Sequence, residues 1–549
     1  MPNTAILRAG QIVPKRVARG PPTVTSVFKP HPPQHRSSHV NYISLSIHRK
    51  NRPGRNKRRV PTAEVRLLLL SYVLASEQSW FMCNRPRTAS IHTLDDDSIL
   101  HVFYLSRPFF GDGDDVADWN YNGRWWYALA HVDRRWRNII LGSASYLGLS
   151  LLCTYGTPVA DILAHSPPLP LVLSYFTKDR KPTTEDEEGI ILALKHRDRV
   201  RRVRFNSAVE QRLFVAMHEE YPILEYLYIT RRIEDDSTIL RFPETLQAPH
   251  LRYLSLRGFT FSIGSRLLTT AVGLVTLQLV MVHPSTYFHP NTLIQWISLM
   301  PHLETLKVYF KSSIPSRDVE RQLTHAPSIA PITLPNLHYI NFRGVSSYLE
   351  ALVHRITTPR LEDLQIGFYN QLLFSVPRLL QFIDAAENLR FGNTVLIFSD
   401  KTFDAGFFPH GGIKECPLGI SVLCWHLDWQ VSSATQISNS LSQMLSAVEY
   451  LVLQHEVHSQ SSEEHNEVDR TEWRNLLRPY TNVKTLRIEK ELVKDLSRCL
   501  ELEDGELPLE LLPELQELIY FGNSDTVDPF TSFVDARRDA GRPVTLFHR

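Results

Sequence analysis

The stretch APHLRYLSL, residues 248–256, combines two patterns that together decide the fold of this chain. Leu254, Ser255 and Leu256 alternate between apolar and polar side chains, which predicts a short strand with one buried face. Leu251 stands three residues before the strand leucine, and a proline two residues earlier predicts a turn at the entrance to the strand. The stretch therefore predicts a turn followed by a strand that packs on one side.

The same pattern, Leu-x-x-Leu followed by any residue and an apolar one, returns along the chain after about residue 195. Its copies are YPILEYLYI (221–229), APHLRYLSL (248–256), AVGLVTLQL (271–279), MPHLETLKV (300–308), LPNLHYINF (334–342), TPRLEDLQI (358–366), SAVEYLVL (446–453), YTNVKTLRI (480–488) and LPELQELIY (512–520). The leading positions of the first six are 27, 23, 29, 34 and 24 residues apart. A period of roughly 20–29 residues is typical of leucine-rich repeats, and the longer steps indicate insertions.

Amphipathic helical stretches stand ahead of most of these units. They are NTLIQWISLM (291–300), SSYLEALVHRI (346–356), VPRLLQFIDAA (376–386), TQISNSLSQML (435–445) and RTEWRNLLRP (470–479). Each unit of helix, turn and strand buries its apolar face only by stacking on its neighbours. We therefore expect an α/β fold over residues 196–549, an irregular leucine-rich-repeat solenoid with a parallel sheet on its concave face and helices outside.

The residues between the buried leucines are expected to point from the concave face of this sheet. Tyrosine, arginine and amide side chains in such positions are typical of protein-binding surfaces. The side chains that we predict to bind a protein substrate are Tyr226, Tyr228, Tyr253, Arg257, Lys307, Tyr339, Arg343, Asp363 and Arg487. The alternative is that they are only the polar side of half-buried strands. Arginines can also pair with a phosphate, but three on a long sheet do not establish that.

Two helical patterns precede the repeats in residues 89–143. Thr93 or Asp95 can cap the first helix, because either side chain can accept from free backbone amides. The loop GDGDDVADWNYNG (111–123) follows, and a second helix is expected through Trp125–Leu141.

Residues 89–145 resemble an F-box. The family pattern is Leu-Pro, an apolar helix ending in Ile-Phe, and a second helix with Val-Cys-x-x-Trp; here Asp95 replaces the Pro and Asp133 the Cys. The segments IHTLDDDSILHVFYL, RWWYALAHVDRRWRNIILGSASYLGLSLLCTYG and WHLDWQ together are similar to F-box-like proteins of mushroom-forming fungi, and the resemblance covers nearly everything after residue 90. The matching residues are Leu94, Ile99, Val102, Phe103, Val132 and Trp136.

This resemblance implies that those six side chains dock onto Skp1, the adaptor of a cullin–RING ubiquitin ligase, and that the repeats select the substrate. Trp136 has two interpretations, contact with Skp1 or packing in the core of its own domain. An alternative function is a repeat scaffold outside such a ligase, in which the F-box-like segment caps the N-terminal end of the solenoid. Residues 146–195 are interpreted as a connecting or capping segment.

The charge of the N-terminal region differs from that of the rest. Residues 1–63 contain no Asp or Glu and thirteen Lys and Arg, whereas the remainder has 47 basic and 58 acidic residues. We interpret residues 1–88 as a disordered basic region, since they show no hydrophobic period; RKNRPGRNKRR (49–59) is a solvated tail or a nuclear import signal. A wrongly assigned start of the chain is a further interpretation. The acidic remainder argues against a nucleic-acid-binding core.

The sequence offers no chemistry for catalysis, so we expect no enzyme, metal or cofactor. It contains no Walker loop, no GxGxxG and no GxSxG, and the segment HEVHSQSSEEH (455–465) lacks the spacing of zinc ligands. Cys424 and His426 belong to ISVLCWHLDW, which reads as an alternating strand in which both share one face. A buried strand cysteine is the ordinary interpretation of such a position.

Cysteine usage and hydropathy bear on the compartment, and we expect a cytoplasmic and/or nuclear protein. The five cysteines are scattered, with no CxxC, which suits a reduced intracellular chain. The apolar run VRLLLLSYVLA (65–75) is about half the length that spans a bilayer. The resemblance implies protein partners, an Skp1-like adaptor with its cullin ligase and a protein substrate, and we expect neither nucleic acid nor membrane.

Overall fold

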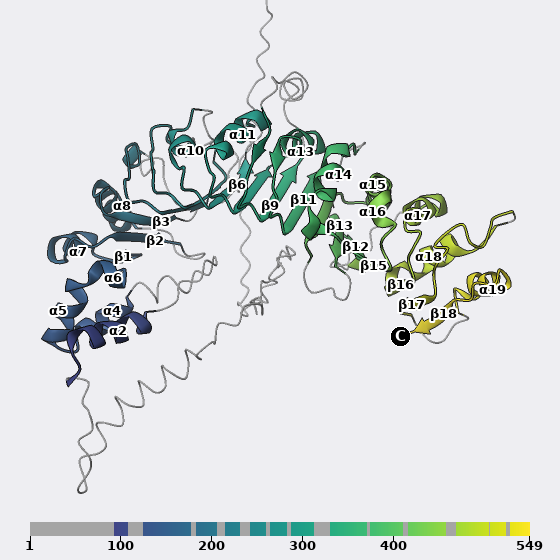
Figure 1. Cartoon of the computed structure of the whole chain (residues 1–549), viewed down its shortest axis with the longest axis horizontal. Helices are drawn as coiled ribbons and strands as arrows, with labels where there is room; N and C mark the ends of the chain where they lie inside the picture. The colour runs from purple at the N-terminus through teal and green to yellow at the C-terminus, as the bar shows by residue number, and fades with distance from the viewer. Residues whose placement is uncertain are drawn as a thin grey trace, which may run out of the picture. The chain divides into compact units, whose positions relative to one another are not determined.

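The chain forms a stack of strands and helices in the computed structural model (Figure 1). The structure describes residues 93–107, 124–176, 183–205, 215–230, 242–259, 264–282, 287–311, 330–369, 374–409, 416–456, 468–503, 505–522 and 528–549. All of them belong to one compact unit, Arg59–Arg549. The predictions for residues 1–88 and for the loop 111–123 lie outside the described residues.

Sixteen strands of the described residues form one sheet, in the order β1-β2-β3-β4-β5-β6-β7-β9-β11-β14-β13-β12-β15-β16-β17-β18. Neighbours pair in parallel, except that β13 runs antiparallel to both β12 and β14. The strands are β1 (Leu151–Cys153), β2 (Leu171–Tyr175), β3 (Val200–Phe205), β4 (Tyr226–Thr230), β5 (Tyr253–Arg257), β6 (Thr276–Val282), β7 (Thr305–Phe310), β9 (Tyr339–Gly344), β11 (Asp363–Tyr369), β12 (Asn393–Ser399), β13 (Thr402–Phe408), β14 (Leu418–Leu423), β15 (Tyr450–Glu456), β16 (Thr485–Ile488), β17 (Glu517–Tyr520) and β18 (Thr545–His548). A separate pair is formed by β8 (Ile332–Thr333) and β10 (Ile356–Thr357).

Each of the nine Leu-x-x-Leu units contains a strand of this sheet, as predicted. The strand leucines stand in register across the repeats, since Leu227 pairs with Leu254, Leu254 with Leu277, and Leu277 with Leu306. All four are buried. Full burial of such a side chain stabilises the fold by about 1.5–3 kcal/mol, so the ladder of leucines holds the repeats together. The chain is thus an α/β leucine-rich-repeat-like solenoid.

Helices cover one face of the sheet, and the five predicted helical stretches are confirmed (Figure 1). Pro290 and Pro377 stand in the first turn of their helices, where their missing amide hydrogens cost nothing. The helices are α7 (Val159–His165), α8 (Thr184–Lys195), α10 (Arg266–Thr270), α11 (Pro290–Ser298), α13 (Ser346–Val353), α14 (Pro377–Asp384), α15 (Leu427–Ser440), α16 (Ser442–Leu445), α17 (Arg470–Leu477), α18 (Val493–Leu500) and α19 (Thr531–Asp539). One hydrophobic cluster runs between helices and sheet from Ile99 to Val544. We call the opposite side of the sheet its second face.

The sheet begins earlier than the sequence indicates. Strands β1 and β2 lie within residues 146–195, which we interpreted as a connecting or capping segment; they pair in parallel with each other, and β2 pairs in parallel with β3. Both strands are buried along their whole length, because Leu152 and Val172 pack with Tyr226 on the second face. Continuous apolar runs of this kind lack the alternation that marks the later repeats.

The region around Cys424 differs from its predicted structure. Strand β14 ends at Leu423 and α15 begins at Leu427, so Cys424 and His426 lie in the connection between them. Cys424 is buried and His426 is exposed, so the expectation that they share one face of a strand is wrong. Trp425 in this connection and Trp429 in the first turn of α15 are both exposed, at a spacing of four residues.

Candidate functional site

The F-box-like segment consists of short helices. Two of them begin after the aspartates that replace the Pro and the Cys of the family pattern. It contains α2 (Asp96–Ser106), α4 (Trp125–Ala130), α5 (Arg134–Gly142) and α6 (Ala144–Leu147). The second predicted helix is therefore broken in two. Asp95 accepts a hydrogen bond from the Ser98 amide at 2.7 Å, and Asp133 accepts one from the Trp136 amide at 2.9 Å. Each aspartate is the N-cap of its helix, so it supplies a start signal where the family has Pro or Cys.

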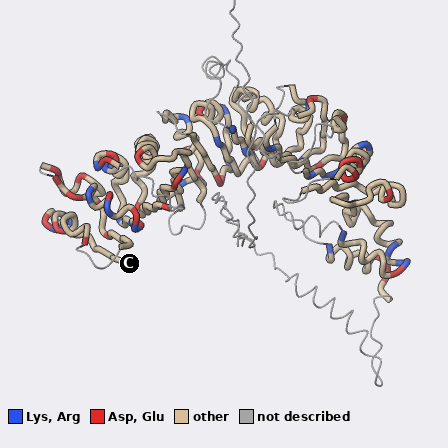
Figure 2. Tube along the Cα trace, turned by 180° about the vertical axis from the view of Figure 1, so that it is seen from behind, with Lys and Arg blue, Asp and Glu red and all other residues tan. Residues whose placement is uncertain are grey.

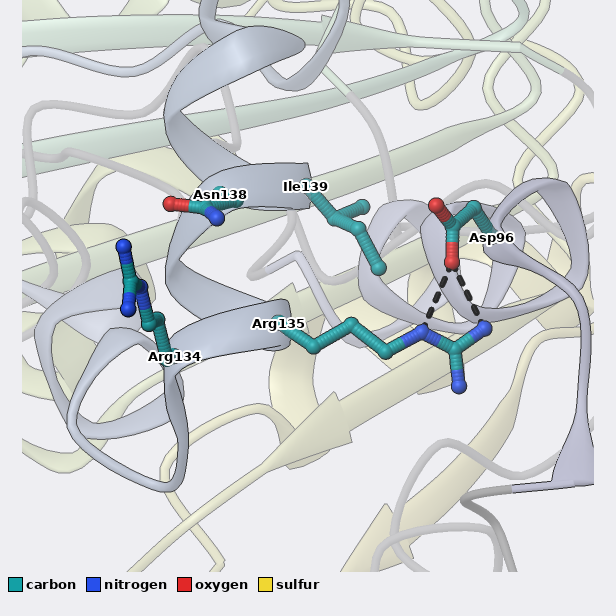
Figure 3. Close-up of a pocket in the computed structure, with 5 residues that line it drawn as sticks. All are labelled: Asp96, Arg134, Arg135, Asn138 and Ile139. Atoms are coloured by element: carbon teal, nitrogen blue, oxygen red, sulfur yellow. Dashed lines mark hydrogen bonds and ion pairs between the residues drawn. The ribbon is translucent and has the colours of Figure 1, made fainter.

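Arg135 links α5 to the start of α2 through a salt bridge and a hydrogen bond. Its guanidinium lies 2.6 Å from Asp96 Oδ1 and donates to the Leu94 carbonyl at 2.7 Å (Figure 3). A shallow hollow beside this pair is lined by Asp96, Arg134, Arg135, Asn138 and Ile139. Both charged partners are largely exposed, so the pair contributes about 0–1 kcal/mol and mainly fixes the orientation of the two helices.

Three of the six side chains predicted to bind Skp1 pack inside the segment. Ile99, Phe103 and Trp136 are buried, and the rings of Phe103 and Trp136 meet edge to face with their centroids 5.0 Å apart. This geometry supports the core-packing interpretation of Trp136. Val102 is half-buried, whereas Leu94 and Val132 are exposed.

The outer side of α2 carries apolar residues that the sequence analysis did not select. Tyr104 and Leu105 are 42% and 66% exposed, and the Tyr104 ring lies 5.1 Å from that of Tyr146, which is also exposed. The sequence does contain a signal for their exposure. Two large apolar residues follow Phe103 directly, and they cannot lie on the same buried side of a helix as Phe103. Leu94, Val132 and Tyr146 are further exposed apolar side chains of this segment.

The segment is continuous with the first strand of the sheet. Leu147, Leu149 and Leu151 are buried in succession in the same hydrophobic cluster as the repeats. The Trp126 indole donates to the Ser150 carbonyl at 3.3 Å, just before β1. The helices therefore cover the apolar end of the solenoid, as an N-terminal cap must.

All nine residues predicted to bind a substrate lie between buried strand positions, on the second face of the sheet, and none is buried. Tyr226 and Tyr253 stack with their ring centroids 4.3 Å apart. Lys307 Nζ lies 5.4 Å from the centroid of the Tyr339 ring, a distance that suits a cation–π contact.

The structure brings seven of these nine residues together on β4, β5, β7 and β9. Asp363 lies on the next strand, β11, whereas Arg487 lies on β16, beyond β14, β13, β12 and β15. The Arg487 guanidinium pairs with Glu489 at 2.8 Å. Arg487 therefore does not belong to the same surface as the others.

Tyr309 is a member of this surface that the sequence analysis missed. It pairs in register with Arg343, whose guanidinium carbon lies 5.6 Å from the centroid of its ring. Burial raises the pKa of Tyr309 to about 12, although the charges of Arg343 and Arg257 oppose that shift. The hydroxyl is therefore neutral and lies within the influence of both arginines.

Strand β3 adds cations that the repeat pattern could not reveal. Arg204 is buried on the second face, with its guanidinium carbon 4.3 Å from the Phe176 centroid and 5.2 Å from that of Tyr228. Burial and the neighbouring Arg201 lower the pKa of Arg202. The strand sequence VRRVRF has no Leu-x-x-Leu, so the repeat pattern did not predict this strand.

The buried cysteines offer no reactive thiol. Burial raises the pKa of Cys153 to about 11 and that of Cys424 and Cys499 to about 12, so these thiols are protonated at neutral pH. No cluster of three or more potential metal ligands occurs within the described ranges. No helix of the described part is long and apolar enough to cross a bilayer. Most of the segment 455–465 lies outside the described residues.

Comparisons with known proteins do not identify a family. No protein-family model matches the chain, and no curated protein does. Among solved structures, the chain is similar to a leucine-rich repeat-containing protein, LegL7, from Legionella pneumophila, at 10% identity and a TM-score of 0.23, over 71% of this chain and 97% of that one. Because the TM-score is below 0.5, we take the fold from the strands and helices described above and not from this likeness.

Proposed function

We propose that this chain is a substrate-recognition subunit of a Skp1–cullin–F-box ubiquitin ligase. In this proposal the outer side of α2 docks onto a Skp1-like adaptor, and the second face of the repeats binds a protein substrate. The observation that carries the first half is the exposure of Tyr104 and Leu105 beside a core that Ile99, Phe103 and Trp136 already fill. Leu105 lies outside this core, and Tyr104 touches it only from its edge through Tyr146, so both side chains are accessible to a partner.

The docking surface we assign differs from the one that the family pattern implies. It consists of Leu94, Tyr104, Leu105 and Val132, all of which are exposed. Covering each by a partner helix contributes on the order of 1–2 kcal/mol, given that part of each side chain is already shielded. Ile99, Phe103 and Trp136 act indirectly, by holding α2 against α5.

The chain would act without catalysing a reaction. Holding a client beside the ligase raises the effective concentration of its lysines near a ubiquitin-loaded enzyme. This role requires two separate surfaces on one chain, and in this proposal they are α2 and the second face of the repeats.

Retention of purified Skp1 by the immobilised chain tests the proposal. We expect wild-type protein to retain Skp1, and the double variant Tyr104→Asp, Leu105→Asp to lose at least nine-tenths of it, since two charges would replace the apolar contact. Leu507→Asp is the matched control, because Leu507 is 72% exposed and lies far along the chain. Wild-type protein that never retains Skp1 contradicts the proposal.

A second candidate function is a repeat scaffold whose helical segment is only a cap. The continuous hydrophobic cluster and the contact between Trp126 and Ser150 favour it, because both serve the end of the sheet. Deleting residues 89–143 should then cause the repeats to aggregate. A soluble deletion product together with Skp1 retention by the full chain would favour docking.

A further inference from the structure

The second face of the sheet carries a one-signed charge in its first half. The strands β1 to β9 contain six cations and no Asp or Glu: the cations are Arg201, Arg202, Arg204, Arg257, Lys307 and Arg343. Acidic residues of this half precede the strands, as Glu225 does, and Arg201 lies 2.9 Å from that carboxylate.

These cations are spread across the sheet and do not converge on one point. Arg204, Arg257, Lys307 and Arg343 lie on β3, β5, β7 and β9, which are separated by at most one other strand in the sheet. Neighbouring strands are about 4.8 Å apart, so the five steps from β3 to β9 cover roughly 24 Å. A single phosphate is held by two or three donors around it, whereas separated cations suit a chain with several carboxylates.

Tyrosines stand between the cations on the same strands. Tyr226, Tyr253 and Tyr339 occupy one register row, and Lys307 and Arg343 each lie over a tyrosine ring. Rings beside charges exclude water and so strengthen the attraction for an opposite charge. They also provide flat apolar area for the residues between the carboxylates of a bound chain.

The backbone is irregular near the end of β6, one of the middle strands between β3 and β9. The pairing of β6 with β7 shifts between Leu279 and Val282, and Met281 has a φ of 58°, which non-glycine residues rarely adopt. Such bulges redirect side chains and concentrate at functional sites. On β11, a Cβ added at Gly367 would lie 3.0 Å from Arg343 Nε, so the arginine side chain lies across this glycine.

We propose that the second face of β3 to β9 binds an extended, Asp- and Glu-rich segment of a client protein. Arg257, Lys307 and Arg343 pair with its carboxylates, and the tyrosines pack against the residues between them. The inference rests on the client-binding half of the proposed function and is independent of the adaptor. A polypeptide fits better than a nucleic acid, because residues 64–549 carry 47 basic against 58 acidic residues and would repel a long polyanion.

Fluorescence anisotropy with the full-length chain and a labelled peptide of about eight residues tests this inference, since that length spans roughly 24 Å when extended. The peptide alternates Asp or Glu with Ala or Tyr, and its control replaces every acid by Asn or Gln. We expect the acidic peptide to bind at least tenfold more tightly than the neutral one. Its affinity should fall as salt is raised, because exposed charges are screened. Equal binding of the two peptides overturns the inference.

Variants locate the binding to this surface. The double variant Arg257→Gln, Arg343→Gln should bind the acidic peptide at least tenfold more weakly, whereas Arg487→Gln, on β16, should bind it as the wild type does. Gly367→Ala should weaken binding severalfold by displacing Arg343, and its control Gly273→Ala should not, because a Cβ at Gly273 meets nothing within 4 Å. Thermal unfolding of each variant verifies that it is folded.

The remaining outcomes distinguish this inference from binding at another site and from binding of another ligand. If the double variant binds like the wild type, the basic residues 1–63 or another surface hold the peptide, and the inference fails. Tighter binding of a neutral peptide with one phosphoserine, or of a short single-stranded RNA, overturns the choice of ligand. No adaptor is present in the assay, so a failure to retain Skp1 leaves its result unaffected.

Discussion

The two halves of the sheet share one architecture and differ on the second face. Strands β3 to β9 present cations and tyrosines there, whereas β11 to β18 contain four acidic residues and a single cation, Arg487. The second half also has a small apolar cluster of its own, in which Val395, Phe408 and Val452 pack together. Both charge signs are frequent along the C-terminal repeats (Figure 2).

This difference shows that the inward positions of the strands are constrained by packing, whereas the outward positions differ between the two halves. The inward positions are leucine or another apolar residue in both halves, because the helices must pack on them. The outward positions do not take part in that packing, so they can change without loss of the fold. A surface for a client can therefore occupy one part of the array.

The largest effect that tests this comparison is expected in the apolar cluster of the second half. Val452→Asp would place a carboxylate among Val395 and Phe408, where Val452 is 2% exposed. Burial of an unpaired charge costs about 3–5 kcal/mol, so we expect faster hydrogen exchange in β12, β13 and β15. Mass spectrometry of exchanged peptides measures it locally.

The matched control lies in the first half. Thr276 has nearly the shape of valine and is half-buried on the second face of β6. Thr276→Asp should lower the free energy of opening that hydrogen exchange measures in β5 to β7 by less than about 1 kcal/mol. The new carboxylate would remain near water at this half-buried position. Equal loss of protection in the two variants would mean that the halves do not differ in this way.

The repeat period alone predicted most of the fold. Leu224, Leu251 and Leu274 mark turns, and the buried leucine of each following strand stands three residues later, so this local pattern needs no distant information. The antiparallel β13 and the early strands β1 and β2 were not predicted. Strands β1 and β2 are buried along their whole length and lack the alternation of a half-buried strand, and β13 alternates but carries no Leu-x-x-Leu pattern.

The candidate surfaces were predicted less completely, for a physical reason. The alternation placed Tyr226, Arg257 and Arg343 on the correct face, because period two follows from the strand itself. Which of them lie together depends on strand order, and the insertion of β12, β13 and β14 separates Arg487 from the rest. In the helical segment the family pattern identified Ile99 and Phe103, which shape the core, and not Leu105 beside them.

A smaller effect is expected at the boundary between the halves, where Gly419 lies on β14. A Cβ at Gly419 would collide with Gln365 Oε1, and the Gln365 amide donates to Asp363 at 2.8 Å and to the Cys416 carbonyl at 3.0 Å. Gly419→Ala should therefore destabilise this region by about 1–2 kcal/mol, a typical cost of overpacking. Gly273→Ala should be neutral or slightly stabilising, since its site is open. Hydrogen exchange in β11 and β14 distinguishes these outcomes.

The smallest expected effect concerns ion pairs between residues of the C-terminal repeats. Glu506 lies 2.7 Å from Arg470 and 3.2 Å from Arg474, both on α17. The hydrogen bond from Arg470 lowers the pKa of Glu506 from its ordinary value of 4.5 to about 2. Because the folded pKa is the lower one, the stabilisation is complete above about pH 4.5 and is lost as the pH falls through about 2.

Glu506→Gln should reveal that contribution as a difference in unfolding midpoint from the wild type. We expect less than about 1 kcal/mol at pH 7, because solvent screens the pair, and a decline towards zero between pH 4.5 and 2. Glu491→Gln is the control, since Glu491 is an exposed residue of the same region. A difference that persists at pH 2, or one as large for Glu491→Gln, would contradict internal pairing. Strands β3 to β9 contain no Asp or Glu, so an acidic segment is the ligand whose charge would complement theirs in our proposal.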